Sequence, residues 1–274
     1  MTSHRIFDWT PRAVVFDCDG TLVDSERHWQ QARDIVLRDH AIEPGPEFTE
    51  STKGLHYTEC GALMARLGGK PDRAEEMTLQ LLATFRALVA QHPAATRGAQ
   101  TLVTALGRGA PLAVASNCPA DVVEFCLESV GLRHHFRHVV VPEAGVRPKP
   151  QPDTYAEAVR RLGVDCGSAL AVEDSVNGLK AAVAAGLRVI GVGRRPGREA
   201  LALADLWVDA LDDPKLTAWA ENRPSALREE TGTARTGSAQ PMVPRQGGPV
   251  RSGIRSAPDG SKLVGDAARD PLFG

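Results

Sequence analysis

Two carboxylates stand two residues apart, directly after a short apolar run near the start of the chain. Residues 13–16 are apolar, Asp17 and Asp19 follow, and Gly20 comes next, which predicts a buried strand that ends in a tight turn. Two carboxylates held within ~4 Å of each other repel by about 4 kcal/mol at an effective dielectric constant near 20. Such a pair persists only if a cation or a shared proton compensates the repulsion, so the stretch predicts a metal site.

Later apolar runs are followed by polar residues of complementary chemistry: Ser116 and Asn117 after residues 112–115, Lys149 after residues 139–141, and Glu173 and Asp174 after residues 169–172. The carboxyl ends of parallel strands lie at one edge of a sheet, where open α/β sheets place their ligands. Carboxylates supply the hard oxygen ligands that Mg²⁺ prefers, and a lysine and a small hydroxyl suit the oxygens of a phosphoryl group. These residues therefore predict a site for Mg²⁺ and phosphate.

The hydrophobic pattern predicts the elements that would hold these residues. Apolar residues at helical spacing, such as Trp29, Ala32 and Val36, recur from residue 25 to about residue 92, with Gly and Pro breaks between the segments. From residue 93 onward, short apolar runs alternate with helical segments, which indicates a parallel sheet covered on both faces. The expected fold class is α/β: a Rossmann-like parallel sheet core with helices on both faces and an inserted small α-helical cap domain.

The same patterns divide the chain into four segments. Residues 1–24 would form the first core strand and its polar loop, residues 25–92 the helical cap, and residues 93–224 the remainder of the core. In residues 225–274, 18 of the 50 residues are Gly, Pro or Ser, so this segment cannot bury enough apolar surface to offset its ordering entropy. We expect it to be a disordered tail, and a tail that folds on a partner is the alternative.

The overall composition bears on partners and location. A net charge of −2 over 274 residues gives no reason to expect binding to nucleic acid or to an anionic membrane surface. The five cysteines are dispersed without C-x-x-C spacing, as is typical of reduced cytosolic proteins. The sequence shows neither a signal-peptide pattern nor an apolar run of ~18 residues, so a cytoplasmic location is expected. The expected partner is a small phosphorylated substrate, and the oligomeric state stays open.

The four motifs together resemble those of the haloacid dehalogenase superfamily: D-C-D-G-T from Asp17, S-N from Ser116, K-P from Lys149 and E-D-S from Glu173. The similarity covers about residues 13–210 and points to the branch with a small helical cap, which includes phosphoglycolate phosphatase-like and β-phosphoglucomutase-like enzymes. It implies a Mg²⁺-dependent phosphatase of a small phosphorylated metabolite, such as a sugar phosphate. The carboxylate of Asp19 argues for phosphoryl transfer, because superfamily members that cleave carbon–halogen bonds lack it.

The resemblance also implies a role for each residue in the reaction. Asp17 would be the nucleophile that forms an aspartyl phosphate, and Asp19 would be the acid that protonates the leaving oxygen and then deprotonates the attacking water. Ser116 and Lys149 would hold the phosphoryl oxygens. Asn117 would be either a further phosphate ligand or a turn former.

The metal and the substrate are assigned in the same way. Mg²⁺ would be bound by Asp17, the backbone carbonyl of Asp19, and Asp174, with Glu173 bound either directly or through one water. The pair Lys53 and Gly54 falls where family members place a loop of the cap that contacts substrate, although lysines are common on any protein surface.

Alternatives to a phosphatase are a phosphosugar mutase and a protein without turnover. In β-phosphoglucomutase-like sequences the first motif continues D-S/T-x-x-x-H, whereas here Trp29 stands at the place of the histidine and His28 lies one residue early. This difference favours hydrolysis, and the apolar stripe predicts that Trp29 packs in the cap core. A signalling receiver domain lacks a helical insert of ~65 residues after its first strand. A non-catalytic scaffold that binds partners is the last alternative.

Overall fold

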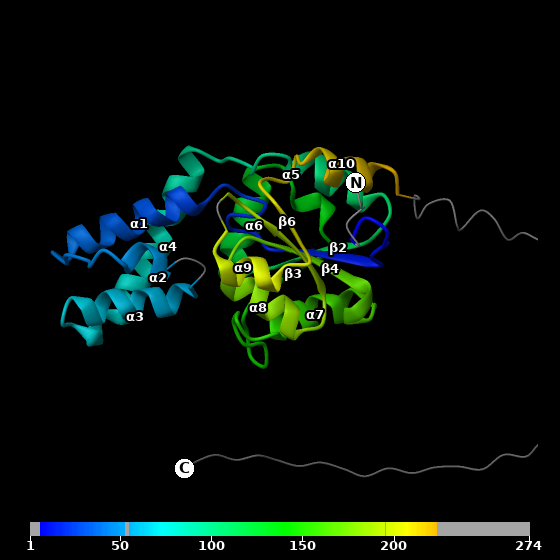
Figure 1. The fold of residues 1–274 in the computed structure, drawn as a ribbon. Coiled ribbons are helices and arrows are strands. Elements are labelled where there is room, and N and C mark those ends of the chain that lie inside the picture. The colour runs from blue at the N-terminus through cyan, green and yellow to red at the C-terminus, as the bar shows by residue number, and fades with distance from the viewer. Residues whose placement is uncertain (1–5, 53–54, 195, 224–274) are drawn as a thin grey trace, which may run out of the picture. The chain divides into compact units, whose positions relative to one another are not determined.

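The computed structural model describes residues 6–52, 55–194 and 196–223 (Figure 1). Six strands form one parallel sheet in the order β3-β2-β1-β4-β5-β6. The strands are β1 (Ala13–Phe16), β2 (Leu112–Ala115), β3 (His138–Val140), β4 (Ala169–Glu173), β5 (Arg188–Val192) and β6 (Leu206–Val208). This strand order is that of the doubly wound Rossmann fold, so the α/β prediction is confirmed.

Strand β1 lies in the middle of the sheet, between β2 and β4. Its last residue, Phe16, pairs with Val114 of β2 and with Val172 of β4, so the three strands end nearly level with one another. All four residues of β1 are buried, because helices cover both faces of the sheet. The register therefore brings the polar residues that follow the three strands to one edge.

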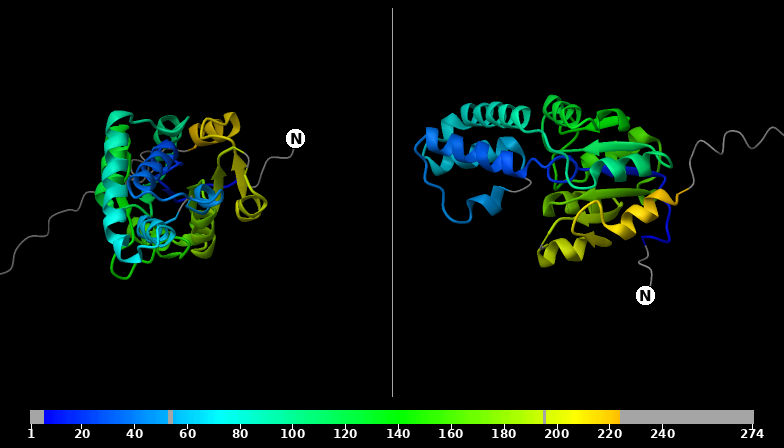
Figure 2. Two further views of the ribbon diagram at one scale, coloured as in Figure 1. Left: turned by 90° about the vertical axis from the view of Figure 1, so that its left-hand side faces the viewer. Right: turned by 90° about the horizontal axis from the view of Figure 1, so that it is seen from above.

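Helices cover the two faces of the sheet in separate layers, as Figures 1 and 2 show. One face packs against α5 (Ala99–Gly107), α6 (Ala120–Ser129) and α10 (Pro214–Glu221), and the other packs against α7 (Asp153–Leu162), α8 (Val176–Ala184) and α9 (Arg198–Leu203). Short 3₁₀ turns occur at η2 (Arg133–His135) and η3 (Cys166–Ser168). The residues of β1 alternate between the two apolar clusters, as a pleated strand requires.

The segment between β1 and α5 is helical and lies beside the sheet in Figure 1. It consists of α1 (Glu26–Asp39), α2 (Phe48–Thr52), α3 (Tyr57–Leu67), the turn η1 (Pro71–Arg73) and α4 (Ala74–Gln91). Helix α4 packs against both α1 and α3. The described residues of this segment include no strand. Its boundary at residues 25 and 92 as a separate domain stays a prediction, since the described residues all fall in one compact unit.

Strand β6 and helices α9 and α10 were not predicted from the sequence, because elements of three to eight residues show too little periodicity. The described residues contain no helix long and apolar enough to cross a membrane. The tail expected at residues 225–274 lies outside the described residues, as do Lys53 and Gly54.

Candidate active site

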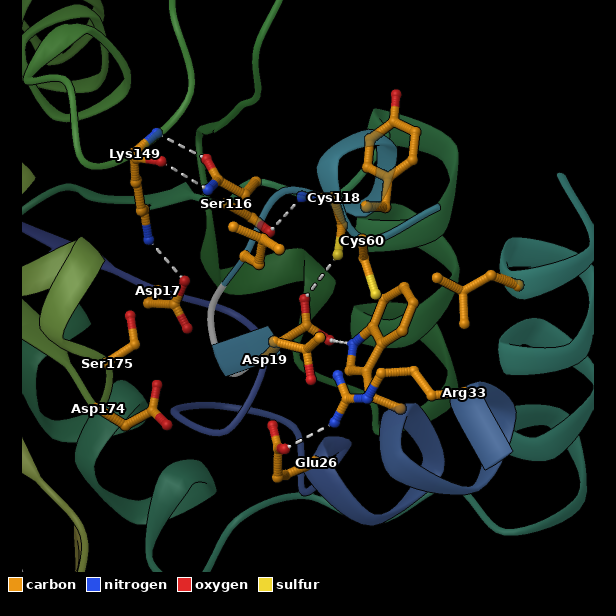
Figure 3. A pocket seen from close by; sticks show the side chains of 16 residues that line it. Asp17, Asp19, Glu26, Arg33, Cys60, Ser116, Cys118, Lys149, Asp174 and Ser175 are labelled. Atoms are coloured by element: carbon orange, nitrogen blue, oxygen red, sulfur yellow. Dashed lines mark hydrogen bonds and ion pairs between the residues drawn. The ribbon is translucent and has the colours of Figure 1, made fainter. Parts of the chain in front are cut away.

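Asp17 and Lys149 form a buried ion pair at the carboxyl edge of the sheet (Figure 3). The backbone N–H of Asp17 donates to the carbonyl of Val172, 2.9 Å away, which extends the pairing of β1 with β4 by one residue. Lys149 Nζ lies 2.6 Å from Asp17 Oδ1 and 2.8 Å from Glu173 Oε2. Buried charges are tolerated only when they are paired, and here the ammonium group of Lys149 pairs with both buried carboxylates.

The pKa values of this cluster follow from burial and from the charges within it. Burial alone would lower the pKa of Lys149, but Asp17 and Glu173 outweigh it and hold the pKa well above its usual value. Burial, reinforced by Glu173 and opposed by Lys149, raises the pKa of Asp17 to about 8. Asp17 therefore needs a second cation if it is to be fully ionised at neutral pH.

Glu173 is fully buried, and both of its carboxylate oxygens already have donors. Oε2 accepts from Lys149 Nζ and from the Tyr155 hydroxyl, each 2.8 Å away, and Oε1 accepts from the backbone N–H groups of the next two residues. Burial would raise the pKa of Glu173, but Lys149 and these hydrogen bonds lower it below its usual value. A Cβ at Gly178 would lie 1.8 Å from Glu173 Oε2, so only glycine fits there.

The carboxylates of Asp17, Glu173 and Asp174 offer oxygen atoms that lie within 4.8 Å of one another. Asp17 Oδ2 is buried and has no hydrogen-bond partner, which leaves it open to a cation. Gly20 has a φ of +87°, and a Cβ there would lie 2.6 Å from Asp174 Oδ2, so glycine lets the loop pass close to this carboxylate. The donor set therefore fits a hard cation such as Mg²⁺.

Ser116 and Asn117 follow β2, as predicted, and reach different partners. The Ser116 hydroxyl accepts from the backbone N–H of Cys118 at 3.1 Å, which leaves its own O–H for a ligand. The Asn117 amide exchanges two hydrogen bonds with the backbone of Lys149, at 2.8 and 3.1 Å. Its side chain thus fixes the segment that carries Lys149, and its role as a phosphate ligand stays a prediction.

Asp19 lies apart from the charged cluster and accepts from three neutral donors. Its Oδ1 accepts from the Ser25 hydroxyl at 2.7 Å and from Trp29 Nε1 at 3.0 Å. Its Oδ2 accepts from Cys118 Sγ at 3.1 Å. Burial and the nearby Asp19 raise the pKa of the Cys118 thiol well above its usual value, so the thiol keeps the proton that it donates. These donors fix the orientation of the Asp19 carboxylate.

Trp29 has a second role that the sequence did not reveal. Its ring stacks on Phe85 of α4 with the centroids 3.7 Å apart and the planes 14° from parallel, which confirms the predicted packing in the cap core. Its indole N–H also reaches Asp19, across from α1 to the loop after β1. A prediction from hydrophobic periodicity treats tryptophan only as an apolar residue, but a buried indole N–H also needs a hydrogen-bond acceptor.

A pocket of about 650 Å³, part of it open to solvent, connects these residues. The sheet edge contributes Asp17, Asp19, Ser116, Asn117, Cys118, Lys149, Asp174 and Ser175; the helical segment contributes Glu26, Trp29, Arg33, Thr52, Leu55, Tyr57, Cys60 and Leu81. Thr52 and Leu55 flank the predicted cap loop. Neither Glu26 nor Arg33 was predicted as a site residue.

Comparison with known sequences gives consistent matches. The family model described as haloacid dehalogenase-like hydrolase matches residues 14–192. The chain is 33% identical over 203 residues to phosphoglycolate phosphatase of Rhodospirillum rubrum, covering 70% of this chain and 83% of the relative. It is 30% identical over 215 residues to hexitol phosphatase B of Escherichia coli K12, covering 74% of this chain and 96% of the relative.

Solved structures give the same result for the fold. CbbY from Rhodobacter sphaeroides, in complex with phosphate, aligns with a TM-score of 0.63 and 28% identity, covering 74% of this chain and 96% of that one. A β-phosphoglucomutase from Clostridium difficile aligns with a TM-score of 0.65 and covers 74% of this chain and 92% of that one. Its identity of 21% shows similarity of fold alone.

Proposed function

The chain belongs to the haloacid dehalogenase-like hydrolases, and we propose that it is a Mg²⁺-dependent phosphatase of a small phosphorylated metabolite. The observation that carries the proposal is the pairing of Asp17 with Lys149 beside a buried, unpartnered Oδ2, with Asp19 held in the same pocket by a hydrogen bond from Trp29. The names of the relatives, phosphoglycolate phosphatase and hexitol phosphatase B, support a phosphomonoester substrate.

Asp17 would act as the nucleophile and form an aspartyl phosphate. Its Oδ1 pairs with Lys149 and its Oδ2 has no protein donor, so one oxygen of the carboxylate could attack phosphorus while the other holds the cation. The resulting covalent intermediate splits one difficult displacement into two steps. Ser116 would donate its O–H to a phosphoryl oxygen, and Lys149 would offset the charge that develops there.

Asp19 would transfer the protons. It would protonate the leaving oxygen in the first step and deprotonate the attacking water in the second. The donors from Ser25, Trp29 and Cys118 hold the carboxylate but leave lone pairs for these transfers.

Mg²⁺ would be held by Asp17 and Asp174 and would neutralise the charge of the nucleophile and of the phosphate. Glu173 would act mainly through Lys149, because both of its oxygens have donors within the protein. Direct contact between Glu173 and the ion, and the Asp19 carbonyl as a ligand, stay predictions.

Trp29 supports hydrolysis over the mutase reaction. An indole N–H donates but cannot accept, so it cannot relay a proton between Asp19 and a sugar hydroxyl as an imidazole can. The aspartyl phosphate would then react with water. Given glucose 1-phosphate and a trace of glucose 1,6-bisphosphate, we expect release of inorganic phosphate. Accumulation of glucose 6-phosphate without phosphate release would support the mutase instead.

Phosphate release from p-nitrophenyl phosphate, phosphoglycolate, sugar phosphates and nucleotides tests the proposal directly. We expect turnover with Mg²⁺ and none with excess chelator. Absence of turnover on every substrate in millimolar Mg²⁺ would instead favour a non-catalytic or signalling protein on this fold.

A further inference from the structure

A partly buried ion pair on the cap side of the pocket has no part in the chemistry described above. Glu26, Trp29 and Arg33 lie on helix α1 at positions i, i+3 and i+7, which share one face of a helix. Because Trp29 touches Asp19, this face looks into the pocket. In Figure 3, Asp19 lies between Asp17 and Arg33. The pair is thus on the side where the leaving group of a phosphomonoester would extend.

Arg33 is buried, with a side chain only 4% exposed, yet its hydrogen-bonding capacity is largely unused. Nη2 donates to Glu26 Oε1 at 3.1 Å and to Gln30 Oε1 at 3.3 Å, and Nε has no partner. Both partners belong to α1 itself. Within the described residues, no hydrogen bond of Arg33 reaches another helix or the core, so holding the cap together does not explain why this guanidinium is buried.

Within the described part of the chain, Glu26 is the carboxylate that forms an ion pair with Arg33. Burial raises the pKa of the neighbouring Cys60 thiol to about 11, against the effect of Arg33, so the thiol is neutral at physiological pH. The Glu26 carboxylate is 42% exposed and uses only Oε1 on Arg33. The pair is therefore neutral overall and presents a free acceptor next to free donors.

We propose that Glu26 and Arg33 bind hydroxyl groups of the leaving group and select polyol or sugar phosphates. A hydroxyl donates and accepts at once, so it can donate to Glu26 and accept from Arg33. A second anionic group would meet an arginine that is already neutralised and a carboxylate that repels it. This inference rests on the proposed phosphatase function and deepens it by naming the chemistry of the leaving group.

The test compares two substrates that share the phosphate but differ in the leaving group. For each variant, kcat/KM for sorbitol 6-phosphate is divided by kcat/KM for p-nitrophenyl phosphate, whose leaving group carries no further hydroxyl. We expect this ratio to fall about 10- to 100-fold in Arg33→Met and about 5- to 10-fold in Glu26→Gln. If Arg33→Met does not fold, Arg33→Lys takes its place in the test, because lysine keeps the positive charge but lacks the planar guanidinium group that can donate two parallel hydrogen bonds.

An exposed ion pair elsewhere in the same helical segment supplies the matched control. Arg73 pairs with Glu76 outside the pocket, so Arg73→Met should leave the ratio unchanged. If the wild type turns over neither substrate, the proposed phosphatase function is wrong. If it turns over p-nitrophenyl phosphate but no variant changes the ratio, the function stands and the role of this pair is wrong. A preference for phosphoglycolate that Arg33→Met removes would assign the pair to an anion and overturn the hydroxyl assignment.

Discussion

Asp17 and Asp19 are two residues apart and lie in opposite electrostatic settings. Asp17 is buried between one ammonium and a second carboxylate, a setting that suits a nucleophile whose charge a cation must balance. Asp19 accepts from a hydroxyl, an indole and a thiol, all of them neutral. Enzymes that use two carboxylates commonly separate nucleophile and acid by such differences in environment. The geometry thus supports different roles for two identical side chains.

The nucleophile assignment is tested by Asp17→Asn. An amide is a poor nucleophile and a poor Mg²⁺ ligand, so kcat should fall about 10³-fold or more. The melting temperature in chelator should stay close to that of the wild type, since the amide oxygen can still accept from Lys149. Asp72→Asn, at an exposed position of η1, is the control and should keep full activity. Phosphate release by Asp17→Asn at the wild-type rate would rule out the assignment.

The positioning role of Trp29 is tested by Trp29→Phe. Phenylalanine can keep the stacking on Phe85 but loses the hydrogen bond to Asp19. We expect kcat to fall roughly 10- to 150-fold with KM nearly constant, because a lost hydrogen bond to a charged group costs about 1.5–3 kcal/mol. Trp219→Phe on α10 is the control and should leave kcat unchanged. A rise in KM at constant kcat would show that Trp29 serves substrate binding rather than Asp19.

Residue types and spacing predicted the polar residues at the sheet edge but not their partners. Asp17, Lys149 and Asp174 do come together, as expected from strands that end at one edge. The hydrogen bond between Trp29 and Asp19 depends on the side-chain rotamer of Trp29, and hydrophobic periodicity in the sequence does not specify a rotamer. Arg33 was missed for a similar reason, because a charged residue on a helix is ordinarily solvated.

At the scale of elements, the start of α8 is linked to Lys149 by hydrogen bonds. The Ser175 hydroxyl caps α8 by accepting from the backbone N–H of Gly178 at 3.1 Å. The same hydroxyl donates to Glu173 at 3.0 Å, and Glu173 in turn holds Lys149. The helix start and the position of Lys149 are therefore set by one connected group of hydrogen bonds.

This connection predicts the effect of Gly178→Ala. The added Cβ would meet Glu173 Oε2 at 1.8 Å, so the carboxylate must move and release Lys149. We expect a loss of about 1–3 kcal/mol in the free energy of unfolding and a clear drop in kcat. Gly167→Ala is the matched control, because a Cβ there meets nothing within 4 Å. Equal denaturation midpoints for the two variants would contradict the close approach at Gly178.

The strands around β1 were predictable because each is a continuous apolar run followed by a polar group. The expected and observed limits differ by at most one residue at each end, as between residues 139–141 and His138–Val140. Strand β6 was not predicted, because a run of only three residues, Leu206–Val208, is equally compatible with a loop. Pairing with β5 makes it a strand, and that is a tertiary interaction.

At the scale of the whole molecule, folding brings the carboxylate of Asp17 close to those of Glu173 and Asp174, which lie far from it in the sequence. Asp17, Glu173 and Asp174 converge, and Lys149 is the ammonium that pairs with two of them. This convergence lowers the stability of the metal-free protein, because the carboxylates repel one another in a buried place. A cation that binds the folded site and not the unfolded chain would restore that stability.

Thermal unfolding with and without Mg²⁺ measures this linkage apart from catalysis. At a free Mg²⁺ concentration about 100 times the dissociation constant, binding adds about 2.7 kcal/mol, which corresponds to roughly 5–10 °C in Tm for a unit of this size. We expect this rise in the wild type and in the exposed control Asp72→Asn, and little or none in Asp174→Asn. Ca²⁺ should also stabilise the fold yet inhibit turnover, because its looser coordination misplaces the nucleophile. An equal rise in Asp174→Asn would place the ion elsewhere, since the loss of a carboxylate ligand must weaken binding at this site.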